Sequence, residues 1–492
     1  MQPKTRPGVV LAIVCIGVVL ATTDLFIVNI AFPALERSFG GRSLAALTWV
    51  LNAYAIVFAA LLVPAGRLAD RASRKGGFLL GVAVFTGASA LCAAAPSVEL
   101  LVGARVVQAA GAALMIPCSL GLLLAAYPPE RRAGAVRIWA AMSGLAAAIG
   151  PVAGGLLVSV DWRWIFLVNL PVGVAALVAG WRLLPSPPPE HEPLPDLLGS
   201  LVLMLAVGAL TLGLVDAPDW GWGAPGTLAA FGAAAVLIVT FVVRSGRHRS
   251  PVLELGLLRV RPFALSTVAM LVFSAGFAAM LLSIVVWAQT GWGWSALKTG
   301  LAFAPGPLMV PLFAIGAGRV AHRVGAATLA TVGCLVYAAG ALTWVATVGL
   351  ESDYVTSMLP GALLTGIGVG LVLPTLTATA ATSLASNRFA TGSAVIQMSR
   401  QVGYTLGVGI LVAVLGAPHT AEERLDAFRR GWIAIAAIAL LAAASSLFLV
   451  RSSQAPTPRA GACGILTVAS RSARSGRAPT RPPRRPGPSE WS

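Results

Sequence analysis

The six residues GRLADR at positions 66–71 have a close echo, GRVAHR, at positions 318–323. Each segment follows one long apolar stretch and precedes another, so the two segments hold equivalent places in two parts of the chain. Duplicated helix bundles are a common way of building membrane transporters. The echo therefore predicts two related halves, with each hexamer in a loop on the same face of a membrane.

The composition around these segments is that of a membrane protein. Hydrophobic residues fill 57% of the 492 positions and charged residues only 11%, less than half of the roughly 25% usual in soluble domains. Apolar runs of about twenty residues recur, each long enough to cross a hydrocarbon core as a helix. The expected spans are 9–32, 47–66, 77–96, 99–122, 137–159, 164–183, 197–215, 226–243, 264–287, 299–317, 327–348, 357–380, 391–415 and 431–450. Runs of this kind differ from the short alternating strands of outer-membrane barrels, so we expect an all-α polytopic membrane protein with about fourteen transmembrane helices.

The same runs suggest a division of the chain. We expect an N-terminal six-helix bundle in residues 1–184, a connector with two additional transmembrane helices in 185–261, and a C-terminal six-helix bundle in 262–450. The connector begins with the proline-rich sequence PSPPPEHEPLPD, which is not helical by composition. Residues 451–492 lack apolar periodicity and are rich in Arg, Pro, Ser and Gly, which predicts a disordered basic cytoplasmic tail.

The distribution of positive charge predicts the orientation. If the N-terminus is cytoplasmic, 26 of the 35 Lys and Arg residues fall on the inner side and seven fall in outer loops. This asymmetry follows the positive-inside rule, so both termini are expected in the cytoplasm of a multi-pass protein of the cell inner (plasma) membrane. The net charge of +17 then reflects topology, and we expect no nucleic-acid partner. The tail is expected to lie on anionic lipid headgroups instead.

Several function classes are disfavoured. None of the three lysines follows a glycine as a phosphate-binding loop requires, so ATP is not the expected energy source. The four histidines lie in separate loops and the five cysteines have no paired spacing, which predicts neither a metal site nor a disulfide framework. No nucleophile, acid and base can be assembled at one membrane depth, so we do not expect an enzyme. We expect no cofactor.

Two of the charged residues within expected spans are the first candidates for function. Asp24 is the only carboxylate well inside a span, and an ionised carboxyl group is costly there, so it is a candidate proton carrier. Arg105 is the matching cation, because a guanidinium cannot lose its proton and needs a partner or a wet cavity. The alternatives are a structural carboxylate bonded to a neighbouring helix, and a structural arginine bonded to a backbone carbonyl.

The chain resembles the fourteen-span drug:proton antiporters, the second such family of the major facilitator superfamily. The matching segments are DLFIVNIAFP at 24–33, GRLADRASRK at 66–75, LVGARVVQAAG at 101–111, GPVAGG at 150–155, WRWIFLVNLPVG at 162–173 and SRQVG at 399–403. The resemblance implies a major facilitator fold of two six-helix bundles plus two extra linker helices. It also implies that the bundles rock about a central cavity and exchange an exported compound for entering protons.

The resemblance also implies roles by position. Asp24 and Arg105 would take part in proton coupling. Conformational gating would involve Gly66, Asp70, Arg71, Arg74, Gly150, Pro151, Gly154 and Gly155. Candidates for the substrate cavity are Asn29, Trp49, Tyr54, Gln108, Gln397 and Arg400. The alternatives are plain positive-inside anchoring for the 66–75 loop, and interfacial anchoring for the aromatic residues.

The predicted function is proton-coupled efflux of small lipophilic or cationic compounds such as antibiotics, driven by the proton gradient. The expected partners are a small-molecule substrate, protons and membrane lipids, and we expect a monomer. Two alternatives remain open. The first is a carrier of the same fold for a metabolite, in either direction, and the second is a membrane sensor or scaffold without transport.

Overall fold

The computed structural model describes residues 7–186, 188, 193–384 and 388–453. Within these residues the chain is helical and has no strand, and fourteen helices are long and apolar enough to span a membrane. The expected number of spans and the all-α class are therefore confirmed. Most of the expected tail, residues 454–492, lies outside the described residues.

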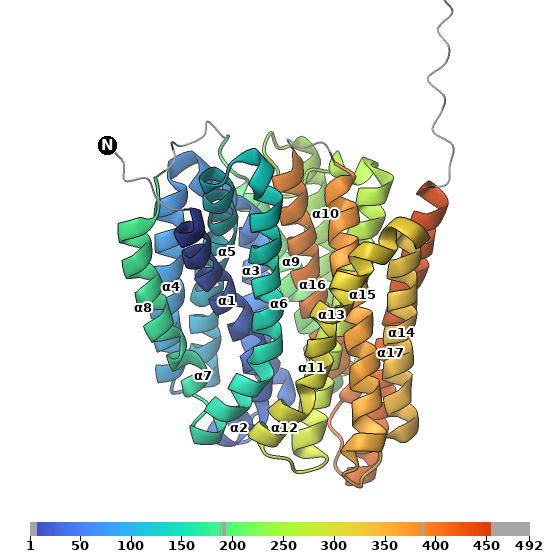
Figure 1. Ribbon diagram of the computed structural model, residues 1–492. Helices are drawn as coiled ribbons and strands as arrows, with labels where there is room; N and C mark the ends of the chain where they lie inside the picture. Colours follow the sequence, from blue (N-terminus) through green and yellow to red (C-terminus); the bar gives the residue numbers. More distant parts are fainter. Residues whose placement is uncertain (1–6, 187, 189–192, 385–387, 454–492) are drawn as a thin grey trace, which may run out of the picture. The chain divides into compact units, whose positions relative to one another are not determined.

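The first half consists of six long helices and two short ones. They are α1 (Pro7–Ile30), α2 (Phe32–Ser38), α3 (Leu44–Ala72), α4 (Arg74–Ala94), α5 (Val98–Ala126), α6 (Pro129–Val160), α7 (Trp164–Leu167) and α8 (Asn169–Leu183). We call the membrane face at which α1 begins the N-side, and the opposite face the far side. The short helices α2 and α7 lie on the far side, at the bottom of Figure 1.

The rest of the chain adds two linker helices and a second half. The linker helices are α9 (Leu197–Trp220) and α10 (Pro225–Arg247). The second half comprises the 3₁₀ turn η1 (Leu257–Arg259), α11 (Arg261–Thr290), α12 (Ala296–Phe303), α13 (Pro305–Val324), α14 (Ala326–Thr347), the π turn η2 (Tyr354–Met358), α15 (Leu359–Thr382), α16 (Phe389–Leu415) and α17 (Ala421–Ser453). One span of this half is divided between α12 and α13, where Pro305 begins a new helix.

The echoed hexamers occupy equivalent places in the two halves. Helix α3 ends six residues after Gly66 and α13 ends six residues after Gly318. After α3 the chain turns at Ser73, which caps the start of α4: its hydroxyl accepts a hydrogen bond from the N–H of Gly76 at 3.0 Å. After α13 the chain turns at Gly325, which has a φ of 86°. Glycine is favoured in this conformation because glycine has no Cβ. In both halves the first long helix packs against the fourth, fifth and sixth, so the structure repeats as the sequence does.

The linker helices α9 and α10 pack against each other, and α9 lies beside the contact between the halves. Helix α9 packs against both α3 and α16, which also contact each other directly. Asp196 caps α9 and accepts hydrogen bonds from the guanidinium of Arg244 on α10 at 2.7 to 3.0 Å. Burial opposes ionisation of Asp196, but the hydrogen bonds from Arg244 and from the N–H of Gly199 outweigh it and lower the pKa of the carboxyl group.

Candidate functional site

Asp24 and Arg105 form an ion pair in the interior of the first half. Asp24 on α1 is 1% exposed and Arg105 on α5 is 0% exposed, so both charges are removed from solvent. A terminal nitrogen of Arg105 donates to Oδ2 of Asp24, and its Nε donates to the carbonyl of Val50 at 3.1 Å. The two charges are costly to bury separately, and the pairing offsets part of that cost.

Three uncharged side chains, Ser89, Gln108 and Asn169, bond to this ion pair or to each other. We call these three residues together with Asp24 and Arg105 the polar cluster. The amide of Gln108 donates to Oδ1 of Asp24 at 2.9 Å and to the hydroxyl of Ser89 at 2.8 Å, while its oxygen accepts from Arg105 at 2.6 Å. The amide of Asn169 also reaches Asp24 and Ser89, each at 3.2 Å. Helices α1, α4, α5 and α8 thus each contribute to one buried network.

The other face of Arg105 lies against aromatic rings. Its guanidinium carbon is 4.2 Å from the ring centroid of Tyr54 and 5.9 Å from that of Phe166. Such contacts favour a desolvated cation. Gln108 and Tyr54 were both expected at the substrate cavity. In this structure Gln108 is part of the polar cluster and Tyr54 lies beside it.

The polar cluster can link a proton to the position of a charged side chain. Ionised Asp24 accepts hydrogen bonds from Arg105, Gln108 and Asn169, and protonation would remove most of the attraction that holds Arg105. A change in the charge of Asp24 would therefore be felt on the three other helices that carry these donors and Ser89.

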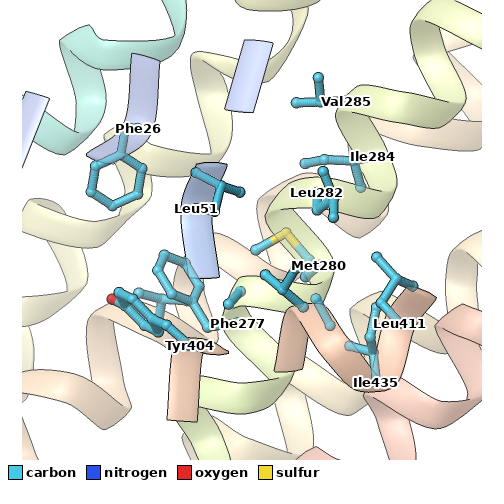
Figure 2. Close-up of a cluster of buried hydrophobic side chains, with 14 of the residues drawn as sticks. Phe26, Leu51, Phe277, Met280, Leu282, Ile284, Val285, Tyr404, Leu411 and Ile435 are labelled. Atoms are coloured by element: carbon cyan, nitrogen blue, oxygen red, sulfur yellow. The ribbon is translucent and has the colours of Figure 1, made fainter. Parts of the chain in front are cut away.

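A small cavity lies between the two halves, beside α1. Its volume is about 30 Å³, which holds a water molecule or two, whereas ligand pockets usually measure about 300 Å³ or more. It is lined by Leu25, Phe26, Asn29, Leu51, Asn52, Ala55, Ala278, Leu281, Tyr404, Thr405 and Val408. Figure 2 shows the rings of Phe26 and Tyr404, which belong to the lining, together with that of Phe277.

Of the residues expected at the cavity, only Asn29 lines it in this structure. Gln397 and Arg400 are half-buried on α16, and the guanidinium carbon of Arg400 is 5.9 Å from the ring centroid of the cavity residue Tyr404. Trp49 is half-buried near the start of α3 and is not among the lining residues. The sequence-based list of cavity residues did not include Asn52, although a polar amide within a long apolar span indicates a candidate.

The segment at 150–155 contacts both halves of the molecule. A Cβ atom added at Gly150 would lie 2.7 Å from Cβ of Phe26, so this glycine allows α6 to pack closely on α1. Gly154 packs on α1 in the same way, at Ile27. A Cβ at Gly155 would instead lie 2.6 Å from the carbonyl oxygen of Ala296 on α12.

The reverse contact comes from the second half. A Cβ at Gly300 on α12 would lie 2.3 Å from the carbonyl oxygen of Pro151 on α6. The two halves therefore meet backbone to backbone towards the far side, and any side chain at Gly155 or Gly300 would push them apart.

The loop after α3 is held by charged side chains. Nε of Arg74 pairs with Oδ1 of Asp70 at 2.5 Å, and the Arg74 side chain lies so close to Gly121 on α5 that an added Cβ would meet it at 2.9 Å. Gly66 packs in the same manner against the ring of Pro117, at 3.1 Å. Arg71 is exposed on the N-side.

Arg67, which the sequence reasoning did not single out, links α3 to the segment that precedes the second half. Its guanidinium donates to the hydroxyl of Ser250 at 2.6 Å, to the carbonyl of Pro251 at 3.0 Å and to the carboxylate of Glu254 at 3.0 Å. The GRLADR segment thus contacts the stretch before η1 through Arg67 and contacts α5 through Gly66.

The protein is similar in sequence to several bacterial export and resistance proteins. It is 33% identical to a probable actinorhodin transporter of Streptomyces coelicolor, over 85% of this chain and 75% of that one. It is 33% identical to a methylenomycin A resistance protein of Bacillus subtilis, over 82% and 87% of the two chains. It is 34% identical to a tetracenomycin C resistance and export protein of Streptomyces glaucescens, over 84% and 77%.

Solved structures share the fold at low sequence identity. The POT family transporter PepTSo matches with a TM-score of 0.65 and 18% identity, over 93% of this chain and 99% of that one. A bacterial homologue of the human lysosomal transporter Spinster matches with a TM-score of 0.64 and 14% identity, over 92% and 98%. The family model of the Major Facilitator Superfamily matches residues 14–408. The chain therefore belongs to the major facilitator superfamily of membrane transporters.

Proposed function

We propose that this protein exports small lipophilic compounds, antibiotics among them, across the plasma membrane in exchange for entering protons. The names of the relatives, which include resistance and export proteins for three different antibiotics, support the substrate class. The observation that carries the proton coupling is the polar cluster, in which a fully buried carboxylate is paired with a fully buried arginine beside the cavity.

The N-side is the cytoplasmic face in this proposal. The support is the sequence-based expectation from the positive-inside rule, which assigns 26 Lys and Arg residues to cytoplasmic segments and seven to outer loops. A substrate then enters the cavity from the N-side and leaves at the far side, while a proton travels in the opposite direction.

Adjacent residues of α1 connect the proton to the substrate. Asp24 belongs to the polar cluster, and the next two residues, Leu25 and Phe26, line the cavity. A proton arriving from the far side neutralises Asp24 and weakens its hold on Arg105, so α1 and α5 can shift relative to each other. Since α6 packs on α1 through Gly150 and Gly154, the shift would be carried to the contact of α6 with α12.

The proton gradient supplies enough free energy for this exchange. A proton entering down a combined driving force of about 150 mV releases roughly 3.5 kcal/mol. At one proton per molecule this sustains about a 300-fold gradient of a neutral substrate. A gradient of that size is large enough to lower the internal concentration of an antibiotic below an inhibitory level.

Expression in a drug-sensitive bacterium tests the proposal. Cells that carry the protein should tolerate higher concentrations of several lipophilic antibiotics than cells with an empty vector. Everted membrane vesicles should accumulate the same compounds when a proton gradient is imposed and should release them when a protonophore collapses it. Accumulation that survives the protonophore, or that requires ATP after the gradient is collapsed, would contradict proton coupling.

A further inference from the structure

Asn52 is a buried amide that has no hydrogen-bond partner in the described part of the chain. It lies on α3, is 0% exposed and lines the cavity between the halves. Neither its side-chain nitrogen nor its oxygen is bonded, although every buried amide group carries a free-energy cost when left unpaired. An apolar residue of similar size would remove that cost. The position of Asn52 therefore indicates a polar partner that enters the cavity, which is water at the present volume and a polar group of a substrate when the cavity is wider.

Arg400 carries a second unpaired polar atom, and it lies on α16, the helix that lines the cavity through Tyr404, Thr405 and Val408. Its Nε is buried without a hydrogen-bond partner, and no carboxylate among the described residues lies within ion-pair distance. This differs from Arg105, whose charge is matched by Asp24. An arginine keeps its charge, and an unmatched charge inside a membrane span is costly and usually functional.

The packing of α16 shows on which side Arg400 lies. Gly403 and Gly407 face α11, because a Cβ at either would lie within 2.3 Å of a backbone carbonyl oxygen of that helix. Tyr404 and Val408 line the cavity, and Arg400 is one turn before Tyr404 on the same face. Since α16 runs from the N-side to the far side, Arg400 stands where a compound from the N-side would reach the cavity.

The cavity also offers aromatic rings from both halves. Phe26 on α1 and Tyr404 on α16 each pack against Phe277 on α11, with ring centroids 6.3 and 5.8 Å apart (Figure 2). Rings in such arrangements can accept a further flat ring by offset stacking. No carboxylate is among the lining residues, and Asp24 is engaged with Arg105, so a cation would meet an unmatched positive charge at Arg400.

Resting on the export proposed above, we infer that the preferred substrates are planar aromatic anions, such as aromatic carboxylates or phenolates. The ring system packs among Phe26, Phe277 and Tyr404, the negative charge faces Arg400, and a carbonyl or hydroxyl group of the substrate pairs with the amide of Asn52. The cavity widens from its present volume when the halves separate around the ligand. This preference agrees with the lipophilic compounds expected from the sequence and disfavours the cationic ones.

Three probes that share one ring system test the charge preference. They are an anthraquinone carboxylate, the matching neutral carboxamide and the matching aminomethyl cation, each titrated against the purified full chain in lipid nanodiscs. The unaltered protein should bind the anion about tenfold or more tightly than the amide, the factor expected of one charge-assisted hydrogen bond, and the cation most weakly.

Variants identify the residues responsible. Arg400→Gln should reduce the preference for the anion over the amide about tenfold, Arg400→Lys should retain most of it, and Arg247→Gln should leave it unchanged. Arg247 is a matched control because it is an exposed arginine at the N-side end of α10. Asn52→Leu should weaken all three probes while the melting temperature stays equal or rises, since the substitution removes an unpaired amide.

The outcomes separate this inference from the proposed export. A wild-type protein that confers resistance but binds the cation as well as the anion, or binds none of the probes, overturns the inference and leaves export standing. An Arg400→Gln variant with an unchanged preference also overturns it. A protein that binds the anion with the expected preference but moves none of it in energised vesicles supports the site and contradicts export.

Discussion

Gly155→Ala should shift the equilibrium between the two access states by separating α6 from α12. The added Cβ would lie 2.6 Å from the carbonyl oxygen of Ala296, whereas ordinary contact begins at 3.4 Å, so the helices must move apart by up to about 0.8 Å. Overpacking of this kind costs about 1–3 kcal/mol. Because the cost falls only on the state in which these helices touch, that state should become about 5- to 150-fold less populated relative to the other.

Spin labels at Ser159 on α6 and Lys298 on α12, in a background without the native cysteines, measure the separation directly. Both positions are exposed towards the far side. The Gly155→Ala protein should show a longer distance as its main population, and the labelled parent protein a shorter one. Gly144→Ala is the matched control, because Gly144 lies on the same helix and an added Cβ there meets nothing within 4 Å. A distance distribution for Gly155→Ala equal to that of Gly144→Ala would refute the role assigned to this contact.

Three further predictions address the ion pairs and the orientation. Arg105→Lys should keep the protein in the membrane but lower transport several-fold, since lysine cannot bond Asp24, Gln108 and the Val50 carbonyl at once; equal efflux at equal expression would make Arg105 a structural cation. Asp196→Asn should lower the melting temperature at neutral pH, because a carboxyl group whose pKa is lowered by folding stabilises the fold at pH values above its unfolded-state pKa of about 3.9. The difference from wild type should persist down to about pH 4 and vanish below it, and a difference independent of pH would contradict the pairing with Arg244. Reporter fusions after Pro188 and Arg451 should report the cytoplasm and a fusion near Pro218 the outside, and an external signal from Arg451 would contradict the assigned orientation.

The sequence predicted the features that depend on long-range composition. Fourteen spans follow from apolar runs that only a membrane accommodates, and the repeat of GRLADR placed equivalent helix breaks in both halves. The pairing of Asp24 with Arg105 was also accessible, because two opposite charges inside a membrane are expected to find each other.

The uncharged members of the site were harder to predict. Ser89 and Asn52 carry no charge, and polar residues of this kind are common in membrane helices. Which of them faces a network and which faces a cavity depends on the rotation of each helix, and that rotation is set by close packing at glycines such as Gly81 and Gly111. For the same reason Gln108, expected at the cavity, points to Asp24 instead. Asn169 lay within a quoted motif, but its contact with Asp24 required the fold.

The most direct test of the account is proton movement in the Asp24→Asn variant. Asparagine keeps the size of the side chain and can still bond to its neighbours, but it cannot ionise. In vesicles, the variant should still exchange labelled for unlabelled substrate without a gradient, while substrate-induced proton release and gradient-driven accumulation should both be lost. Asp216→Asn is the control, because Asp216 is a half-buried carboxylate near the end of α9, a helix that contributes nothing to the polar cluster, and its loss should leave both signals intact. If Asp24→Asn couples efflux to the proton gradient at the wild-type rate and membrane abundance, the proton travels elsewhere and the central claim is wrong.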